Sequence, residues 1–148
     1  MQAVVVYDSV YGNTEKVAQA IGEGIGSGVP VLQAAGAQAS DLEGLELLVV
    51  GSATHGGRPT EALQGFLARV EGVSLDGIKV AAFDTRLATR LVAVFGYAVK
   101  RIAAELEGRG GKLVASPEGF VVGGRKGPLQ EGELERATAW GRKIATEG

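Results

Sequence analysis

Ser9-Val10-Tyr11-Gly12-Asn13-Thr14 comes one residue after the apolar run Ala3-Val4-Val5-Val6-Tyr7, close to the start of the chain. The apolar run predicts a buried strand over 3–7, and apolar residues at spacings of three and four predict a helix over 14–25. A strand that turns into a helix directs several backbone N–H groups and the positive end of the helix dipole to one spot. The side chains of Ser9, Asn13 and Thr14 add donors, so the turn predicts an anion socket suited to a phosphate monoester.

Two common nucleotide-binding loops do not fit this turn. The loop of nucleotide triphosphatases needs Gly-Lys-Ser/Thr after four spacer residues, whereas Lys16 comes only after the predicted helix has begun. The dinucleotide fingerprint opens a helix, whereas the glycine run over 22–28 follows one and predicts a helix end and a turn. A turn without lysine suits a ligand whose single terminal phosphate is held by hydrogen bonds. The alternative is a helix start without a ligand, in which Thr14 and Glu15 form an ordinary first turn.

Strand and helix signals alternate along the chain. Five such units predict an α/β fold with a doubly wound five-stranded parallel sheet, strand order 2-1-3-4-5, in a single domain spanning residues 1–148. Ligands of such folds bind beyond the carboxyl ends of the strands, between the first and third strands. The last helix is predicted to turn Leu134 inward and to pack Trp140 in the core. The predicted strands cover 3–7, 29–32, 47–50, 78–83 and, in two pieces, 112–114 and 120–122; the predicted helices cover 14–25, 60–70, 97–107 and 131–146, with a brief helix or turn at 41–45.

The composition of the chain excludes several classes of function. Lys and Arg total 15 and Asp and Glu total 17, and the resulting formal charge of −2 offers no overall attraction to nucleic acid or to an acidic membrane. The chain has no cysteine, which excludes disulfides and thiolate redox chemistry, and its one histidine cannot build a structural zinc site unaided. We see no leader peptide and no apolar run of 18 residues. We therefore expect a cytoplasmic protein that binds neither membranes nor nucleic acid.

The segment 7–18, from Tyr7 to Ala18, closely resembles the phosphate loop of flavodoxins, including the flavodoxin domains of flavodiiron proteins. The general family pattern is Thr/Ser-x-Thr-Gly-x-Thr/Ser. The chain departs from it at Tyr11, where most flavodoxins have threonine and the flavodiiron branch also has an aromatic, and this removes one hydroxyl from the socket. The resemblance extends over nearly the whole chain and implies noncovalent binding of FMN. Its phosphate would be held by Ser9, Val10, Tyr11, Gly12, Asn13 and Thr14.

Two further loops leave the same edge of the predicted sheet, and the resemblance assigns them the flavin ring. In the loop over 51–59, a backbone carbonyl near Gly56 or Gly57 would turn toward flavin N5. His55 would supply a flat side chain against the ring, or would instead cap the next helix or face solvent. The residues expected to frame the isoalloxazine are Thr54, His55, Gly56 and Gly57 from this loop, and Asp84, Thr85 and Arg86 from the loop over 84–97.

Two other segments each admit two interpretations. The apolar residues 91–95 indicate packing beneath the following helix, or a weak dimer or partner patch beside the flavin edge. The basic turn over 123–127 indicates an ordinary solvated loop, or a contact with an acidic partner.

The resemblance implies a carrier of single electrons between a reductase and an acceptor enzyme, rather than a stand-alone enzyme. A net charge of −2 offers little electrostatic steering toward a basic reductase. Two alternatives stay open at this point. One is an FMN-dependent NAD(P)H oxidoreductase that acts on a quinone or a similar acceptor, and the other is a flavin-free binding module of the same fold.

Overall fold

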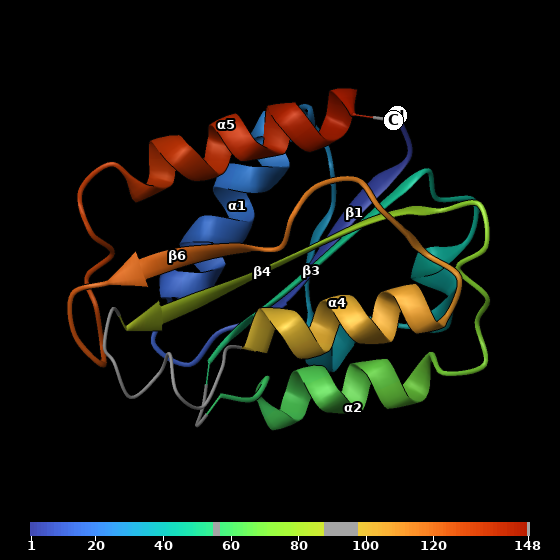
Figure 1. Ribbon diagram of the computed structural model, residues 1–148, viewed down its shortest axis with the longest axis horizontal. Coiled ribbons are helices and arrows are strands. Elements are labelled where there is room, and N and C mark those ends of the chain that lie inside the picture. The colour runs from blue at the N-terminus through green and yellow to red at the C-terminus, as the bar shows by residue number, and fades with distance from the viewer. Residues whose placement is uncertain (55–56, 88–97, 148) are drawn as a thin grey trace.

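A computed structural model describes residues 1–54, 57–87 and 98–147, and confirms the predicted alternation of strands and helices (Figure 1). The brief helix or turn predicted at 41–45 is confirmed in part, because residues 41–42 belong to the second of two short 3-10 turns and are followed by a turn. These turns are η1 (Ala34–Gly36) and η2 (Ala39–Leu42). The strands are β1 (Ala3–Asp8), β2 (Val31–Gln33), β3 (Leu47–Ala53), β4 (Lys79–Leu87), β5 (Lys112–Leu113) and β6 (Glu118–Val122), and the helices are α1 (Asn13–Ile25), α2 (Glu61–Arg69), α4 (Ala98–Gly108) and α5 (Glu133–Thr146).

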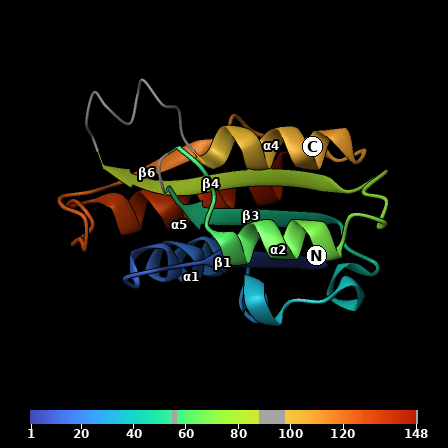
Figure 2. The same cartoon turned by 90° about the horizontal axis from the view of Figure 1, so that it is seen from below.

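The sheet is parallel and has the strand order β2-β1-β3-β4-β5, as predicted. Figure 2 shows β1, β3 and β4 side by side in this order. The fifth strand comes in two pieces that follow each other along β4. The piece β5 pairs with Lys79 and Val80 of β4, whereas β6 pairs with the later residues Phe83 to Leu87. The carboxyl ends of β1, β3, β4 and β6 therefore lie at one edge of the sheet, where ligands bind in folds of this topology.

Both faces of the sheet are covered, which explains why its strands read as continuous apolar runs. Alternate residues of β1 point to opposite sides. Val4 and Val6 join the core formed with α2 and α4, whereas Val5 and Tyr7 join the core formed with α1 and α5. Figure 1 shows the two pairs of helices. Trp140 lies in the second core, as predicted, and meets the rings of Phe83 and Phe120 edge-on. The prediction for Leu134 is wrong, because its side chain is 40% exposed.

Helices α1 and α5 pack with their backbones in close contact, and glycine makes this possible. A Cβ at Gly24 would overlap the carbonyl oxygen of Thr138, and a Cβ at Gly141 would overlap the carbonyl oxygen of Ile21. The glycine run was predicted to form a helix end and a turn. That holds for Gly26, which caps the helix, but Gly24 lies inside α1. This packing sets α5 alongside α1, so the loop between β6 and α5 comes to the edge of the sheet where α1 begins.

Within the described part of the chain, no helix has the combination of length and apolar content that a bilayer crossing requires.

Candidate functional site

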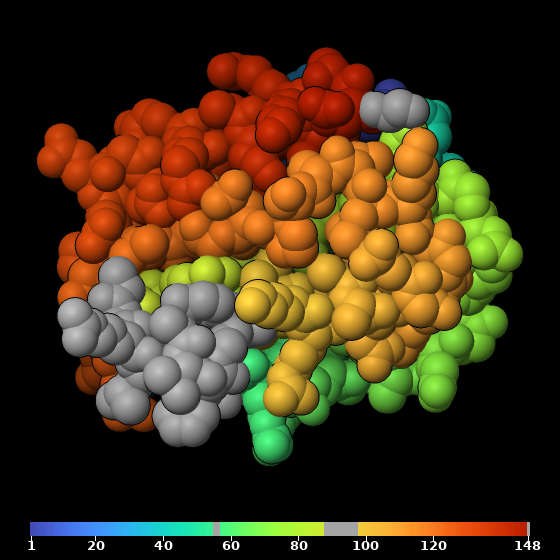
Figure 3. Space-filling view, in the orientation of Figure 1, coloured from blue at the N-terminus to red at the C-terminus, as the bar shows by residue number. Residues whose placement is uncertain are grey.

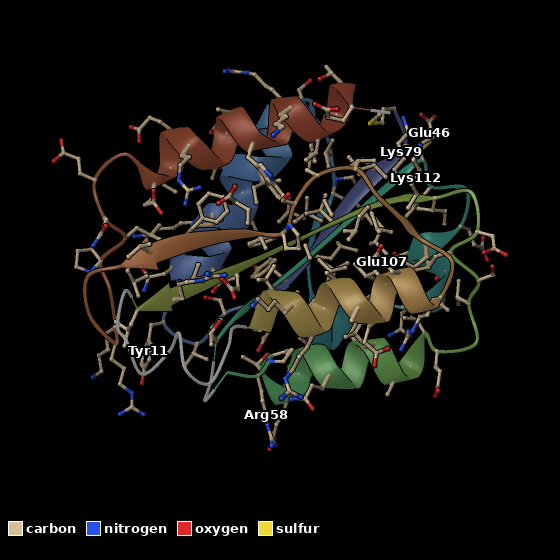
Figure 4. All side chains as sticks on the ribbon, viewed as in Figure 1. Tyr11, Glu46, Arg58, Lys79, Glu107 and Lys112 are labelled. Carbon is tan, nitrogen blue, oxygen red and sulfur yellow. The ribbon has the colours of Figure 1, made fainter. Side chains whose placement is uncertain are left out.

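The turn between β1 and α1 has the geometry expected of an anion socket. Gly12 adopts the left-handed conformation, with φ of +91°, which glycine accepts without strain. Its N–H donates to Ser9 Oγ at 3.0 Å, and its carbonyl accepts the first helical hydrogen bond from Lys16 N at 3.2 Å. Because a glycine occupies the N-cap position, it brings no side chain to accept hydrogen bonds from the N–H groups of the first helical turn. Tyr11, which belongs to the same turn, lies near the edge of the sheet formed by the carboxyl ends of its strands (Figure 4).

Thr14 and Thr85 join the first loop to the end of β4. Their hydroxyl oxygens lie 2.7 Å apart, and the residues are 1% and 5% exposed. Two hydroxyls in contact share one hydrogen bond and have a second proton left to donate. The predicted phosphate ligand Thr14 and the predicted ring contact Thr85 thus form one polar unit inside the sheet edge.

A second polar unit consists of Thr54, Asp84 and Arg86, which were also predicted as ring contacts. Asp84 is fully buried, and its carboxylate accepts hydrogen bonds from Thr54 Oγ1 at 3.1 Å and from Arg86 Nε at 2.7 Å. It also accepts from the Val99 N–H at 3.0 Å, while Ala98 N donates to Thr54 Oγ1 at 3.3 Å. Asp84 and Thr54 therefore hold the start of α4 against the sheet.

The carboxyl group of Asp84 has a raised pKa. Burial is the largest cause, because the interior solvates a carboxylate poorly. The positive charge of Arg86 and the hydrogen bonds from Val99, Arg86 and Thr54 oppose the effect and favour the ionised form. Asp84 and Arg86 thus form an ion pair that is largely removed from solvent, directly beside two loops of the candidate site.

The loop after β3 is described only in part. Gly57 is buried and has φ of +78°, so a side chain there would strain the backbone. Ser52, which the sequence did not single out, is fully buried, accepts a hydrogen bond from Thr60 N at 3.0 Å and donates to Ala53 O at 2.8 Å. Thr60 in turn caps α2 by accepting from Leu63 N at 3.4 Å. The predicted contacts His55 and Gly56 and the apolar segment 91–95 lie outside the described residues.

The loop between β6 and α5 also reaches the first turn, which the sequence did not predict. Asn13 Nδ2 donates to the backbone carbonyl of Lys126 at 3.1 Å, and Lys126 Nζ lies 5.8 Å from the centre of the Tyr11 ring. The sequence left two interpretations of this basic turn, an ordinary solvated loop or a contact with an acidic partner. Its side chains are exposed, but its backbone is bonded to the candidate phosphate loop.

A groove lies elsewhere on the molecule. A groove of about 810 Å³ runs between α2 and α4, which adjoin on the face seen in Figure 3. Side chains of both signs line it, among them Glu71, Arg101 and Glu105. The groove follows two helices rather than the carboxyl ends of the strands, so it does not coincide with the sheet-edge position where this topology binds its ligands.

The fold and the sheet edge together define a doubly wound α/β protein. At its edge between β1 and β3, a glycine turn leads into α1, whose N-cap residue makes no side-chain cap hydrogen bond. A family model described as flavodoxin matches residues 5–140, and the chain therefore belongs to the flavodoxin family. Flavodoxins bind FMN and transfer electrons to redox partners. No curated protein sequence matches the chain.

Solved structures show the same fold over the whole chain. A flavodoxin from the domain Archaea is 27% identical, with a TM-score of 0.81, over 98% of this chain and 96% of the other. Oxidised flavodoxin 2 from Bacillus cereus is 25% identical, with a TM-score of 0.83, over 98% of each chain. The Flv1 flavodiiron core from Synechocystis sp. PCC6803 is 19% identical, with a TM-score of 0.77, over 97% of this chain and 34% of the other.

Proposed function

We propose that this chain binds FMN noncovalently at the sheet edge and carries single electrons between a reductase and an acceptor protein. The observation that carries the proposal is the start of α1, where a left-handed glycine follows β1 and leaves the first N–H groups of the helix without a side-chain cap. Its position at the switch point between β1 and β3, in a member of the flavodoxin family, makes the phosphate of FMN the fitting ligand.

The residues of the turn would hold the phosphate by hydrogen bonds. Ser9 Oγ already accepts from the Gly12 N–H, so its own proton is available to a ligand oxygen. The pair of Thr14 and Thr85 has one further proton to donate. Each hydrogen bond to a charged oxygen contributes about 1.5–3 kcal/mol. Two hydroxyls and two or three backbone donors are then enough to fix one end of the cofactor.

FMN supplies the electron-transfer chemistry, and the protein binds and orients it and sets the electrostatics around the ring. We propose that the ring lies between the loops after β3 and β4, framed by Thr54, His55, Gly56 and Gly57 and by Asp84, Thr85 and Arg86. The ion pair of Asp84 and Arg86 lies 2.6 Å apart and is desolvated, so it would act on the ring through a medium of low polarity.

The first test is the visible spectrum and mass of the cofactor in purified protein. We expect one FMN per chain, with no FAD or riboflavin. Protein that stays colourless after incubation with excess FMN would contradict the proposal and favour a flavin-free binding module of this fold.

The second test separates a carrier from an enzyme. We expect a redox titration to resolve two one-electron potentials, and we expect no steady-state oxidation of NADPH with a quinone unless a reductase is added. Rapid turnover by the protein alone would instead support an FMN-dependent NAD(P)H oxidoreductase.

The third test is the double variant S9A/T14V, which removes two hydroxyls from the turn. We expect it to weaken FMN while sparing riboflavin, which has the same ring and no phosphate. An equal loss of both ligands would show that the two side chains do not act on the phosphate.

A further inference from the structure

We propose that Lys126, in the loop between β6 and α5, is the cation that neutralises the phosphate bound at the first turn. The inference rests on the proposed function and adds to it a residue that lies outside the three loops assigned to the cofactor. The observation behind it is the contact of this loop with Asn13 and Tyr11.

The loop is fixed against the phosphate turn through its backbone. Asn13 Nδ2 donates to the carbonyl oxygen of Lys126 at 3.1 Å, which joins residues 113 positions apart in the chain. The loop itself is closed by a hydrogen bond from Gly123 N to Pro128 O at 2.8 Å. The backbone of Lys126 therefore has a defined place beside the start of α1.

Close approach at this point requires glycine next to the lysine. Gly127 has φ of +101°, and a Cβ there would lie 2.7 Å from the side chain of Asn13. A residue with a side chain would be strained at this φ and would collide with the Asn13 amide that bonds the loop. The position of Lys126 is thus set by its neighbour as well as by its own hydrogen bond.

The charges around the turn show why a nearby cation would strengthen phosphate binding. The segment 8–15 carries the two carboxylates of Asp8 and Glu15 and no lysine or arginine, and the exposed Lys16 follows it in the first turn of α1. A phosphate with close to two negative charges placed there meets like charges, which disfavours binding. Lys126 Nζ lies 5.8 Å from the centre of the Tyr11 ring, so the long side chain crosses over the same turn.

The ammonium group of Lys126 lies over the aromatic ring of Tyr11. A lysine over a tyrosine ring within about 6 Å is attracted by the ring, by about 0.5–1 kcal/mol at an exposed site. Tyr11 stands where most flavodoxins have a threonine, so the turn lacks one hydroxyl donor. We infer that the cation held over this ring takes the place of the missing hydrogen bond.

Lys126 is exposed to solvent, so its effect on the phosphate is screened. We expect K126M to weaken FMN about 3- to 10-fold in buffer of low ionic strength. Riboflavin affinity should stay within the error of the wild type. The FMN effect should disappear at about 1 M salt, where the Debye length is about 3 Å.

The experiment measures dissociation constants of FMN and riboflavin by quenching of flavin fluorescence, with the apoprotein of each variant. The wild type, K126M and the charge-conserving K126R are compared at low and high salt. K112M is the matched control, because Lys112 carries the same charge at the opposite edge of the sheet (Figure 4). We expect K126R and K112M to bind FMN like the wild type.

The outcomes separate this inference from the proposed function. If the wild type prefers FMN to riboflavin but K126M binds FMN equally well at low salt, Lys126 is not the neutralising cation and the proposed function stands. The same conclusion follows if K112M loses as much affinity as K126M, because the effect is then one of overall charge. If the wild type does not prefer FMN to riboflavin, the phosphate site and this inference both fail.

Discussion

The buried pair of Thr14 and Thr85 gives a sharp test of how the candidate site is built. The two hydroxyl oxygens lie 2.7 Å apart and are almost completely removed from solvent. Replacing either residue with valine keeps the shape but leaves the other hydroxyl buried without this partner, which costs about 1–3 kcal/mol. Replacing both removes the two polar groups together, so T14V/T85V should lose clearly less than the sum of the single variants. For a domain of this size, each kcal/mol corresponds to a fall of about 2–4 °C in Tm.

Urea unfolding of the apoprotein at pH 7 measures the four free energies of this double-mutant cycle. T14S is the control, because it keeps the hydroxyl and should retain the coupling to Thr85. Free energies that add in T14V/T85V would refute the reasoning, since additivity is the behaviour of residues that do not interact.

Three further predictions concern stability and its dependence on pH. Gly24→Ala places a Cβ against the backbone of α5 and should cost about 1–3 kcal/mol in urea unfolding, whereas Gly26→Ala, whose Cβ meets only an ordinary contact, should be nearly neutral. The hydrogen bonds from Arg136 lower the pKa of Glu133 below its usual 4.5. E133Q should therefore cost about 1 kcal/mol of unfolding free energy at pH 7, and the difference in free energy from the wild type should shrink as the pH falls below 4.5. A difference that stays constant with pH would contradict this. Burial raises the pKa of Asp84 above its usual 3.8. The wild type should therefore lose stability relative to D84N as the pH rises from 3.8 through that raised pKa. Parallel profiles of unfolding free energy against pH would show that folding does not raise the pKa of this carboxyl.

Much of the fold could be predicted because the strands are buried on both faces. Continuous apolar runs such as 47–50 mark such strands, and their alternation with helices leaves few possible topologies. The error at Leu134 has a different origin. Helical spacing places this residue near the inward stripe of α5, but how far the stripe extends depends on the helix against which α5 packs, and Leu134 lies 40% exposed.

The candidate site could be predicted only where it is local in sequence. The turn over 9–14 shows its strand, its glycine and its hydroxyls in consecutive residues. The pairing of Thr14 with Thr85 and the contact of Asn13 with Lys126 join residues 71 and 113 positions apart. Such contacts depend on strand register and on the packing of α5 against α1, which hydrophobic periodicity does not specify. The hydrogen bond from the Val99 N–H to Asp84 was missed because it depends on how α4 packs against the end of β4.

The central claim is that the turn between β1 and α1 binds the phosphate of FMN. The most direct measurement compares amide 1H–15N spectra of the apoprotein saturated with FMN and with riboflavin, because the two ligands differ only in the phosphate. We predict that the largest differences between the two spectra fall on the amides of residues 9–14 and on Lys126. Differences centred on the groove between α2 and α4, or the absence of any difference at residues 9–14, would contradict the account.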